Sequence, residues 1–335
     1  MRAIFALPIL AILSSVYASA GDRAHDFQRC TFMCDNRECK NHSPTPLPLA
    51  LRITKWTCLD NCKYNCMHEI TINLTAAGKR PLQYYGKWPF IRVAGMQEPC
   101  SVLFSLFNLW VHFQGYSRIQ KMIPRIHPLK TYYLVWSVAS MNTWIWSAVF
   151  HTRDTPLTEK FDYFSAAFTI LTALYFTAIR FFHLYTPSAR ALPAPVRIMA
   201  FRAWTTICVV TFIGHILYLS LPPRFDYRYN IIFNLVIGLS HNALWLLYSL
   251  PESMSLLTRF PNRLRTYCPR RLANKAAVLV TLTTAATAFE LFDFPPWRKV
   301  IDAHALWHLV TAPIACAWYH FLILDASDPS WKEIR

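Results

Sequence analysis

The sequence predicts an all-α membrane protein, a bundle of seven transmembrane helices preceded by a cysteine-rich, lumenal N-terminal domain. Three observations predict this fold class. Hydrophobic residues make up 54% of the 335-residue chain and charged residues only 16%, against about 25% charged residues in an average globular protein. Long apolar segments recur from about residue 99 onward. Six of the ten cysteines fall within residues 30–66.

The N-terminus has the pattern of a cleaved signal peptide. Arg2 is followed by the apolar run 3–13 and then by Ala-Ser-Ala at 18–20, which resembles a signal-peptidase site. The alternative is a first transmembrane helix, but crossing the hydrocarbon core takes about 20 apolar residues. We therefore expect residues 1–20 to be a signal peptide, so that the mature chain begins in the lumen of the secretory pathway.

Residues 21–98 have the cysteine content of a small domain stabilised by disulfides. The clustered cysteines are Cys30, Cys34, Cys39, Cys58, Cys62 and Cys66. Their spacing would also suit a zinc site, but in an oxidising compartment disulfides are favoured, in one of about fifteen pairings. Asn41 and Asn73 begin glycosylation sequons, which would be used if this region is lumenal. Pro44 weakens the first of them.

The segment 99–324 contains seven apolar stretches of nearly the length that a transmembrane helix requires. They cover residues 99–117, 131–151, 161–180, 200–221, 229–249, 275–293 and 302–324. Because irregular backbone is not tolerated facing lipid, these stretches predict a helical bundle. A short polar tail, 325–335, follows.

Charge asymmetry and the signal peptide independently indicate the same orientation. If the N-terminal domain is lumenal, the first, third and fifth connections between spans are cytosolic. These connections contain fourteen basic residues and one acidic residue, Glu252, whereas the opposite connections contain six of each. Basic residues concentrate in cytosolic loops. The net charge of +16 is therefore explained by topology rather than by a nucleic-acid partner, and the C-terminus is cytosolic.

Five polar residues lie near the lumenal ends of the expected spans. Ser147 and His151 are four residues apart in the second span, as are His304 and His308 in the seventh, so each pair shares a helix face. Asp162 opens the third span. The orientation brings all five residues to one leaflet at similar depth. Because ionisable groups inside a membrane are costly, such residues are functional candidates.

Three histidines, two of them one helical turn apart, form the ligand set of a catalytic zinc with an open fourth position. At such a site Zn²⁺ acidifies water to a pKa of about 7 and polarises carbonyl groups. Asp162 could accept a proton, and Ser147 could donate to a developing oxyanion. The alternative is a Ser-His-Asp triad with Ser147 as nucleophile, which leaves His304 and His308 unexplained.

The sequence around these residues resembles that of the post-GPI-attachment-to-proteins factor three family, from about residue 21 to residue 324. More broadly, the pattern resembles the superfamily of alkaline ceramidases and progestin/adiponectin receptors. The motifs that carry the resemblance are Trp-Ser-Ala-Val-Phe-His-Thr-Arg-Asp at 146–154, Leu-Thr-Glu-Lys-Phe-Asp-Tyr-Phe at 157–164, Phe-Asp-Phe-Pro-Pro at 292–296, Asp-Ala-His-Ala-x-Trp-His at 302–308 and Gly-Lys-Trp-Pro-Phe at 86–90.

The resemblance implies remodelling of glycosylphosphatidylinositol (GPI) anchors. The reaction would remove the unsaturated sn-2 acyl chain from the phosphatidylinositol of GPI-anchored proteins, which would be the substrate partners. By the same resemblance His151, His304 and His308 would bind Zn²⁺, and Ser147 and Asp162 would assist ester hydrolysis. It allows residence in the Golgi membrane or, alternatively, the endoplasmic reticulum. A seven-helix receptor, or a lipid-binding or trafficking factor without hydrolysis, is the alternative from a different class.

Three further acidic residues lie near the lumenal ends of the last two spans. They are Glu290, Asp293 and Asp302. Each could hydrogen-bond a zinc-binding imidazole, or could be ordinary interfacial charge.

Overall fold

The computed structural model of the chain describes residues 19–40, 46–185, 193–222, 225–251, 254, 257, 260, 270–329 and 331. The N-terminal helices are α2 (Ala20–Arg23), α3 (His25–Cys34), the π-helix η1 (Asp35–Cys39), α4 (Leu49–Ile53) and α5 (Cys58–Ala76). The long helices are α6 (Pro99–Met122), α7 (Lys130–Thr152), α8 (Pro156–Phe181), α9 (Ala194–Ser220), α10 (Tyr227–Ser249), α11 (Arg270–Leu291) and α12 (Ala303–Ala326). Most of the expected signal peptide (1–18), the sequon at Asn41 and the end of the tail (332–335) lie outside the described residues.

The chain forms two compact units. The first consists of Met1–Phe104, Ala148–Thr158 and Phe289–Leu306, and the second of Ser105–Ser147, Glu159–Ala288 and Trp307–Arg335. The first unit therefore contains the cysteine-rich region, and the second contains most of the long helices.

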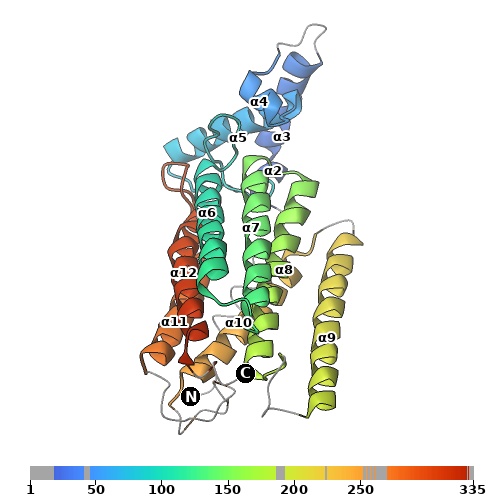
Figure 1. Ribbon diagram of the computed structural model, residues 1–335. Helices are drawn as coiled ribbons and strands as arrows, with labels where there is room; N and C mark the ends of the chain where they lie inside the picture. The colour runs from blue at the N-terminus through green and yellow to red at the C-terminus, as the bar shows by residue number, and fades with distance from the viewer. Residues whose placement is uncertain are drawn as a thin grey trace, which may run out of the picture. The chain divides into compact units, whose positions relative to one another are not determined.

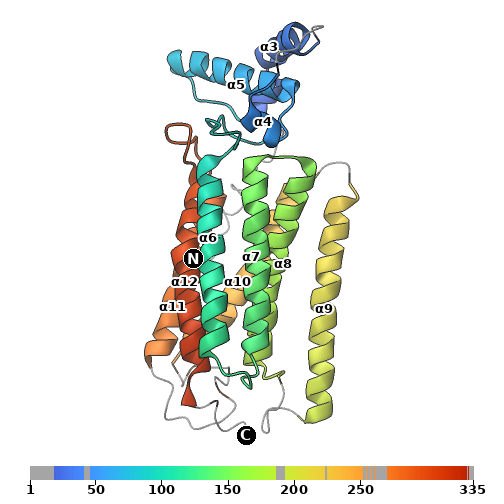
Figure 2. The same cartoon turned by 45° about the horizontal axis from the view of Figure 1, so that its top comes forward.

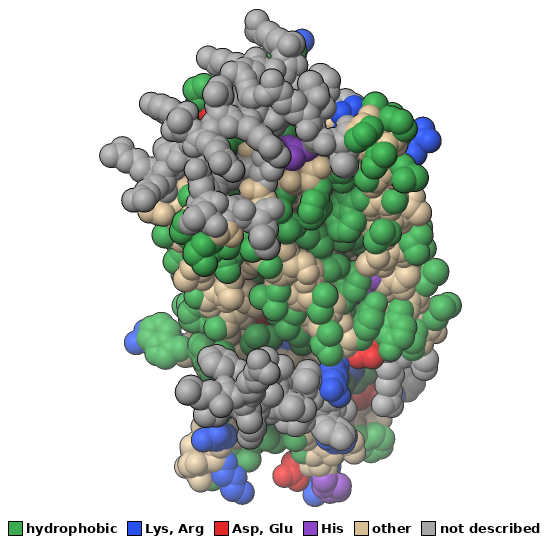
Figure 3. Space-filling view, turned by 90° about the horizontal axis from the view of Figure 1, so that it is seen from below, with side chains coloured by type: hydrophobic (Ala, Val, Ile, Leu, Met, Phe, Trp, Pro, Cys, Tyr) green, Lys and Arg blue, Asp and Glu red, His purple; other side chains and the backbone are tan. Residues whose placement is uncertain are grey.

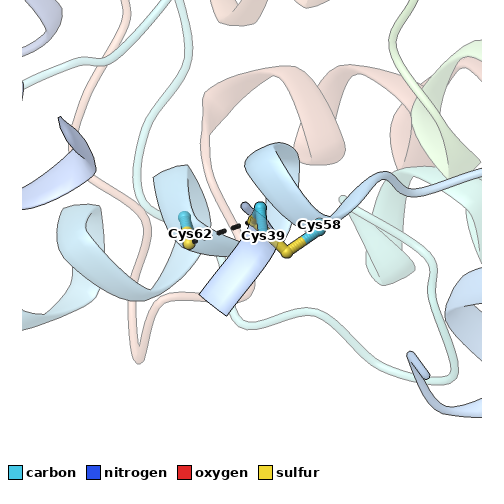
Figure 4. Close-up of side chains that lie close together, drawn as sticks. All are labelled: Cys39, Cys58 and Cys62. Atoms are coloured by element: carbon cyan, nitrogen blue, oxygen red, sulfur yellow. Dashed lines mark hydrogen bonds between the residues drawn. A yellow bond between two sulfur atoms is a disulfide. The ribbon is translucent and has the colours of Figure 1, made fainter. Parts of the chain in front are cut away.

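Three nested disulfides stabilise the N-terminal domain of the first unit, in which α3 and η1 pair with α5 (Figure 1). They join Cys30 to Cys66, Cys34 to Cys62 and Cys39 to Cys58. Figure 4 shows the last of these, with the Cys62 sulfur 3.9 Å from that of Cys39. The disulfide interpretation of this cluster is confirmed, and because all six sulfurs are paired, none is left to bind zinc.

The π-helical turn η1 follows from the spacing of these cysteines. On α5 successive cysteines are four residues apart and share one face, as do Cys30 and Cys34. Cys39, however, follows Cys34 by five residues. A π turn accommodates one more residue than an α turn, and the Lys40 N–H accordingly donates to the Asp35 carbonyl at 3.0 Å. The wider turn keeps Cys39 in line with Cys58.

The loop around Asp293 also belongs to the first unit. Its carboxylate accepts hydrogen bonds from Gln83 Nε2 at 2.6 Å and from Trp88 Nε1 at 2.7 Å. The Ile91 N–H donates to the Lys299 carbonyl at 2.9 Å. Asp293 thus joins segments that are about 200 residues apart in the chain.

The second unit is a bundle of helices that run alongside one another, with α9 beside α8 in Figures 1 and 2. Tyr175 on α8 and Thr205 on α9 share a hydrogen bond of 2.9 Å. At the core of the bundle Arg180 makes a bidentate pair with Asp325, at 2.9 and 2.5 Å, and both side chains are fully buried. The Tyr248 hydroxyl also donates to Asp325, at 3.1 Å. This ion pair connects α8, α10 and α12.

Close packing of α6 on α12 places polar groups inside this unit. A Cβ at Gly115 would lie only 2.3 Å from the Tyr319 ring, so glycine permits the approach. One turn earlier, His112 Nδ1 and the Tyr319 hydroxyl are 2.7 Å apart. The histidine is buried, and its hydrogen bond offsets the cost of that burial.

Among the described residues, five helices are long and apolar enough to cross a membrane: α8, α9, α10, the segment Leu272–Leu291 of α11, and α12. Hydrophobic side chains form most of the described surface visible in Figure 3. Helices α6 and α7 reach spanning length with 24 and 23 residues but are more polar. Buried serine, asparagine and histidine side chains account for part of that polarity. Seven long helices occupy the seven expected segments among the described residues, and the spanning of all seven stays a prediction.

The observed bounds of α8 differ from the expected ones in a way that moves a candidate residue. This helix begins at Pro156, not at residue 161, because Thr155 and Thr158 cap it. The Thr158 N–H donates to Thr155 Oγ1 at 3.2 Å, and the Thr155 N–H to Thr158 Oγ1 at 2.9 Å. Asp162 therefore lies in the second turn of α8 rather than at its start.

Candidate metal and ester-hydrolysis site

Two helix ends carry the candidate histidines. His151 lies in the last turn of α7 and His304 in the first turn of α12. Helix α12 begins where Asp302 caps it, since Asp302 Oδ1 accepts the Ala305 N–H at 2.8 Å. His308 follows His304 by one turn on the same helix, and therefore on the same face. Asp302 is thus a helix cap.

In the first unit, each of two imidazoles is held by a carboxylate. His151 Nδ1 donates to Glu98 Oε2 at 2.8 Å, and His304 Nδ1 donates to Glu290 Oε2 at 2.7 Å. The two Nε2 atoms face each other at 3.3 Å. With both Nδ1 atoms used as donors, both Nε2 atoms are acceptors in the neutral rings. Two such lone pairs at this distance require a shared cation, either a proton or a metal ion.

The carboxylate of Glu98 is itself part of a buried charge network. Lys87 forms ion pairs with Glu98 and, at 3.3 Å, with Asp154. Burial alone would raise the pKa of Glu98, but the charges of Lys87 and His151 hold this pKa well below its ordinary value. Burial alone would lower the pKa of Lys87, and Glu98 and Asp154 reverse that effect. Glu98 is therefore ionised where it contacts the imidazole.

Main-chain hydrogen bonds also hold Glu98 next to His151. The last carbonyl groups of a helix have no partner within the helix. At the end of α7 the Glu98 N–H donates to the His151 carbonyl and the Gln97 N–H to the Thr152 carbonyl, both at 3.0 Å. Glu98 thus contacts His151 through both its backbone and its side chain, which restricts the orientation of the ring.

In the second unit, two serines lie next to the remaining histidine. Ser105 Oγ is 2.9 Å from His308 Nδ1 and 3.0 Å from Ser147 Oγ. Asn108 Nδ2 donates to the His308 carbonyl at 2.6 Å, and the Trp144 ring packs edge-on against the imidazole. Ser147 is therefore connected to His308 through Ser105.

Asp162 is half-buried in the second unit. Its carbonyl accepts a hydrogen bond from the Ser165 hydroxyl at 2.9 Å, which stabilises this turn of α8. Asn73 is exposed on α5, and its glycosylation stays a prediction.

The described residues include histidines and cysteines of the kind that bind metal ions. His151 and His304, both in the first unit, are among these histidines. Another group consists of cysteines of the N-terminal domain, whose sulfurs are in disulfides. Because these cysteine sulfurs are in disulfides, the histidines remain the candidate metal ligands, and imidazole is a usual ligand of zinc.

Two residues whose side chains hydrogen-bond the candidate imidazoles, Glu98 and Ser105, were not among the sequence-based candidates. Glu98 precedes the first apolar segment by one position, and Ser105 is one of several serines in that segment. An acidic residue directly beside an apolar stretch was the available signal for Glu98. The sequence left open whether Glu290 contacts an imidazole or is ordinary interfacial charge, and in the structure it contacts the ring of His304.

Comparisons with known proteins agree with one another. Residues 48–326 match the sequence model of the Per1-like family. The chain is 41% identical to the Protein PER1 homolog of Schizosaccharomyces pombe, covering 96% of this chain and 92% of that one. It is 37% identical to the mouse GPI-specific phospholipase A2-like PGAP3, covering 92% and 89%. It is 34% identical to the Drosophila melanogaster Post-GPI attachment to proteins factor 3, covering 95% and 93%. No solved structure matches the chain.

Proposed function

Because the chain belongs to the Per1-like family, we propose that it remodels GPI anchors by hydrolysing the sn-2 acyl ester of their phosphatidylinositol. The relatives whose names describe them as GPI-specific phospholipase A2-like support this reaction class. GPI-anchored proteins are then the substrates.

The observation that carries the proposal is the pair of facing imidazole nitrogens. His151 Nε2 and His304 Nε2 are 3.3 Å apart. Two nitrogens bound tetrahedrally to zinc at about 2.0–2.1 Å are separated by about 3.3–3.4 Å. The carboxylates on both Nδ1 atoms match the partners that zinc-binding histidines usually have. The chemistry and spacing of these donors therefore fit Zn²⁺.

His308 completes the proposed ligand set, since it lies one turn beyond His304 on α12. A bound Zn²⁺ would supply Lewis acidity, polarising the ester carbonyl and acidifying a water molecule. Glu98 and Glu290 keep the Nδ1 protons of their histidines in place. Ser105 does the same for His308 by accepting from its Nδ1, which leaves Nε2 of each ring as the ligand atom.

The remaining residues would handle the proton and the developing negative charge. Asp162 would accept the proton of the attacking water, as a carboxylate of suitable basicity does in general base catalysis. When Ser105 accepts from His308, its own hydroxyl proton points to Ser147 Oγ. The Ser147 proton is then available to the substrate oxygen, where charge develops during the reaction.

The proposal includes a location and an orientation. The basic connections on one side of the bundle indicate a cytosolic C-terminus and a lumenal N-terminal domain, on which Asn73 would be glycosylated. The same proposal includes a cleaved signal peptide and membership of the ceramidase-like superfamily. It also includes residence in the Golgi membrane, with the endoplasmic reticulum as the alternative. In this orientation the acyl ester of a GPI anchor and the three candidate histidines lie in the same leaflet, the lumenal one.

The test is lipid analysis of GPI anchors from cells that carry only a variant of this protein. We expect His308→Ala and Asp162→Asn to leave the unsaturated sn-2 chain on the anchors. His320→Ala, an exposed histidine on the same helix, is the matched control and should behave as wild type. Unchanged sn-2 composition in all three variants, at normal expression and localisation, would instead indicate a trafficking or receptor function. Purified protein with full activity and no metal would favour Ser147 as nucleophile.

A further inference from the structure

The N-terminal domain contains a cleft that the proposed hydrolysis does not use. Its volume is about 320 Å³, within the usual range of small-molecule sites, about 300–1,000 Å³. The lining residues used below are Asp22, Gln28, Thr31, Phe32, Asp35 and Tyr85. They come from α2, α3, η1 and the loop that follows α5, and all belong to the first unit.

Two aromatic side chains are exposed at this cleft. Phe32 is 65% exposed and Tyr85 58% exposed. Tyr85 has a φ of 52°, a left-handed conformation that is uncommon for a bulky residue. Asp22 Oδ1 accepts the Tyr85 N–H at 3.0 Å, and the Lys63 ammonium lies 5.1 Å from the ring centre. The backbone is thus held so that an apolar ring is presented to solvent.

Polar groups surround these rings. Asp22 and Asp35 supply carboxylates, and although Asp35 also pairs with Lys40 at 2.8 Å, a carboxylate has about four acceptor positions. Gln28 adds an amide. The Thr31 hydroxyl is buried and has no hydrogen-bond partner among the residues that the structure describes. The cleft therefore combines aromatic faces, charged acceptors and an unpaired hydroxyl.

We propose that this cleft binds carbohydrate, namely the glycan of the GPI anchor, an inference that rests on the proposed function. A sugar ring has an apolar C–H face that packs on the electron-rich face of an aromatic ring, and hydroxyls that donate to carboxylates in charge-assisted hydrogen bonds. The two carboxylates disfavour a phosphate or nucleotide. The cleft would hold the anchor by its sugars while its lipid is hydrolysed elsewhere in the chain.

The experiment is a calorimetric titration of the purified full-length protein with the water-soluble glycan headgroup of a GPI anchor, freed of its lipid and of its phosphate groups. We expect Phe32→Ala and Tyr85→Ala each to weaken binding at least tenfold, and Tyr85→Phe to retain it because the ring remains. Met33→Ala is the matched control, since Met33 is 59% exposed on the same helix but does not line the cleft. Because the truncated side chains are exposed, folding should be preserved.

The outcomes separate this inference from the proposed hydrolysis. Absence of headgroup binding to wild type, or equal binding by the Phe32→Ala and Tyr85→Ala variants, overturns the carbohydrate site whatever the lipid analysis shows. Headgroup binding that depends on the rings of Phe32 and Tyr85 supports the carbohydrate site. If anchors nevertheless keep their sn-2 chain in the presence of the wild-type protein, the proposed hydrolysis is wrong and the carbohydrate site still stands. With hydrolysis intact, Tyr85→Ala should raise KM for a complete anchor about tenfold, leave kcat unchanged, and not affect hydrolysis of sugar-free phosphatidylinositol.

Discussion

Glu98 accepts a 2.8 Å hydrogen bond from His151 Nδ1, and its own backbone N–H donates to the His151 carbonyl. A residue from the start of one long helix thereby determines which nitrogen of a histidine at the end of the next helix is available. Lys87 keeps the carboxylate ionised in a buried position.

We therefore expect Glu98→Gln to weaken zinc binding by about 10- to 100-fold, the usual effect of removing a hydrogen-bond partner of a metal-binding histidine. The amide can still accept the Nδ1 proton but lacks the charge that makes the ring a stronger ligand. Zinc content after equilibration with graded chelator concentrations measures the effect. Glu69→Gln, at an exposed acid of α5, is the control. An unchanged zinc affinity in the Glu98 variant would show that this contact is only structural.

Ser147→Ala distinguishes the two hydrolytic mechanisms. If Ser147 donates a hydrogen bond to the reacting oxygen, its loss should lower kcat by about 10²- to 10³-fold. If it is the nucleophile, kcat should fall by about 10⁶-fold. Acyl-ester hydrolysis by the purified variant decides between these values. Ser137→Ala, a buried serine of the same helix that donates to the Tyr133 carbonyl, should retain wild-type kcat.

Replacing either Arg180 or Asp325 alone should destabilise the protein much more than replacing both residues together. Replacing one partner leaves an uncompensated charge in the bundle, so Arg180→Met should destabilise the protein by about 3–5 kcal/mol. The double variant Arg180→Met, Asp325→Leu should recover most of that loss, because an apolar pair fits the surrounding aromatic rings. Denaturant unfolding of the purified protein tests both. Equal destabilisation by the single and double variants would refute the compensation.

Acid should destabilise the N-terminal domain through His68. Burial lowers the pKa of this ring, and the Phe90 carbonyl, which accepts its Nε2–H at 2.9 Å, only partly opposes the shift. The folded protein therefore binds fewer protons than the unfolded chain, whose histidine pKa is about 6.5. The stability contribution is complete above that pH and is lost as pH falls toward the folded pKa.

Thermal unfolding at a series of pH values between about 7.5 and 5 measures this loss. His68→Gln keeps a donor for the carbonyl and does not titrate, so the variant should lose less stability on acidification than wild type. His25→Gln, at an exposed histidine of the same domain, should follow the wild-type curve. Parallel curves for wild type and the His68 variant would contradict the assignment.

Much of the helical architecture could be predicted because it depends on local patterns. Apolar length located every long helix, and four-residue spacing correctly paired His304 with His308 on α12. The start of α8 was misplaced because the threonine cap and its proline precede the apolar run. Glu98 was missed because it lies 53 residues from His151, and no periodicity in the sequence relates the two positions. Long-range contacts of this kind appear only in the folded chain.

The nested order of the three disulfides has a consequence for how the N-terminal domain is oxidised. Sequence separations are 19 residues for the innermost bridge, 28 for the middle one and 36 for the outermost. Loop closure is least costly for the shortest loop. Once Cys39 and Cys58 are joined, the next bridge has to close only the short ring through 34–39 and 58–62. Oxidation can thus proceed outward from the innermost bridge. The first bond formed already excludes about twelve of the fourteen incorrect pairings, because the four remaining cysteines can pair in only about three ways.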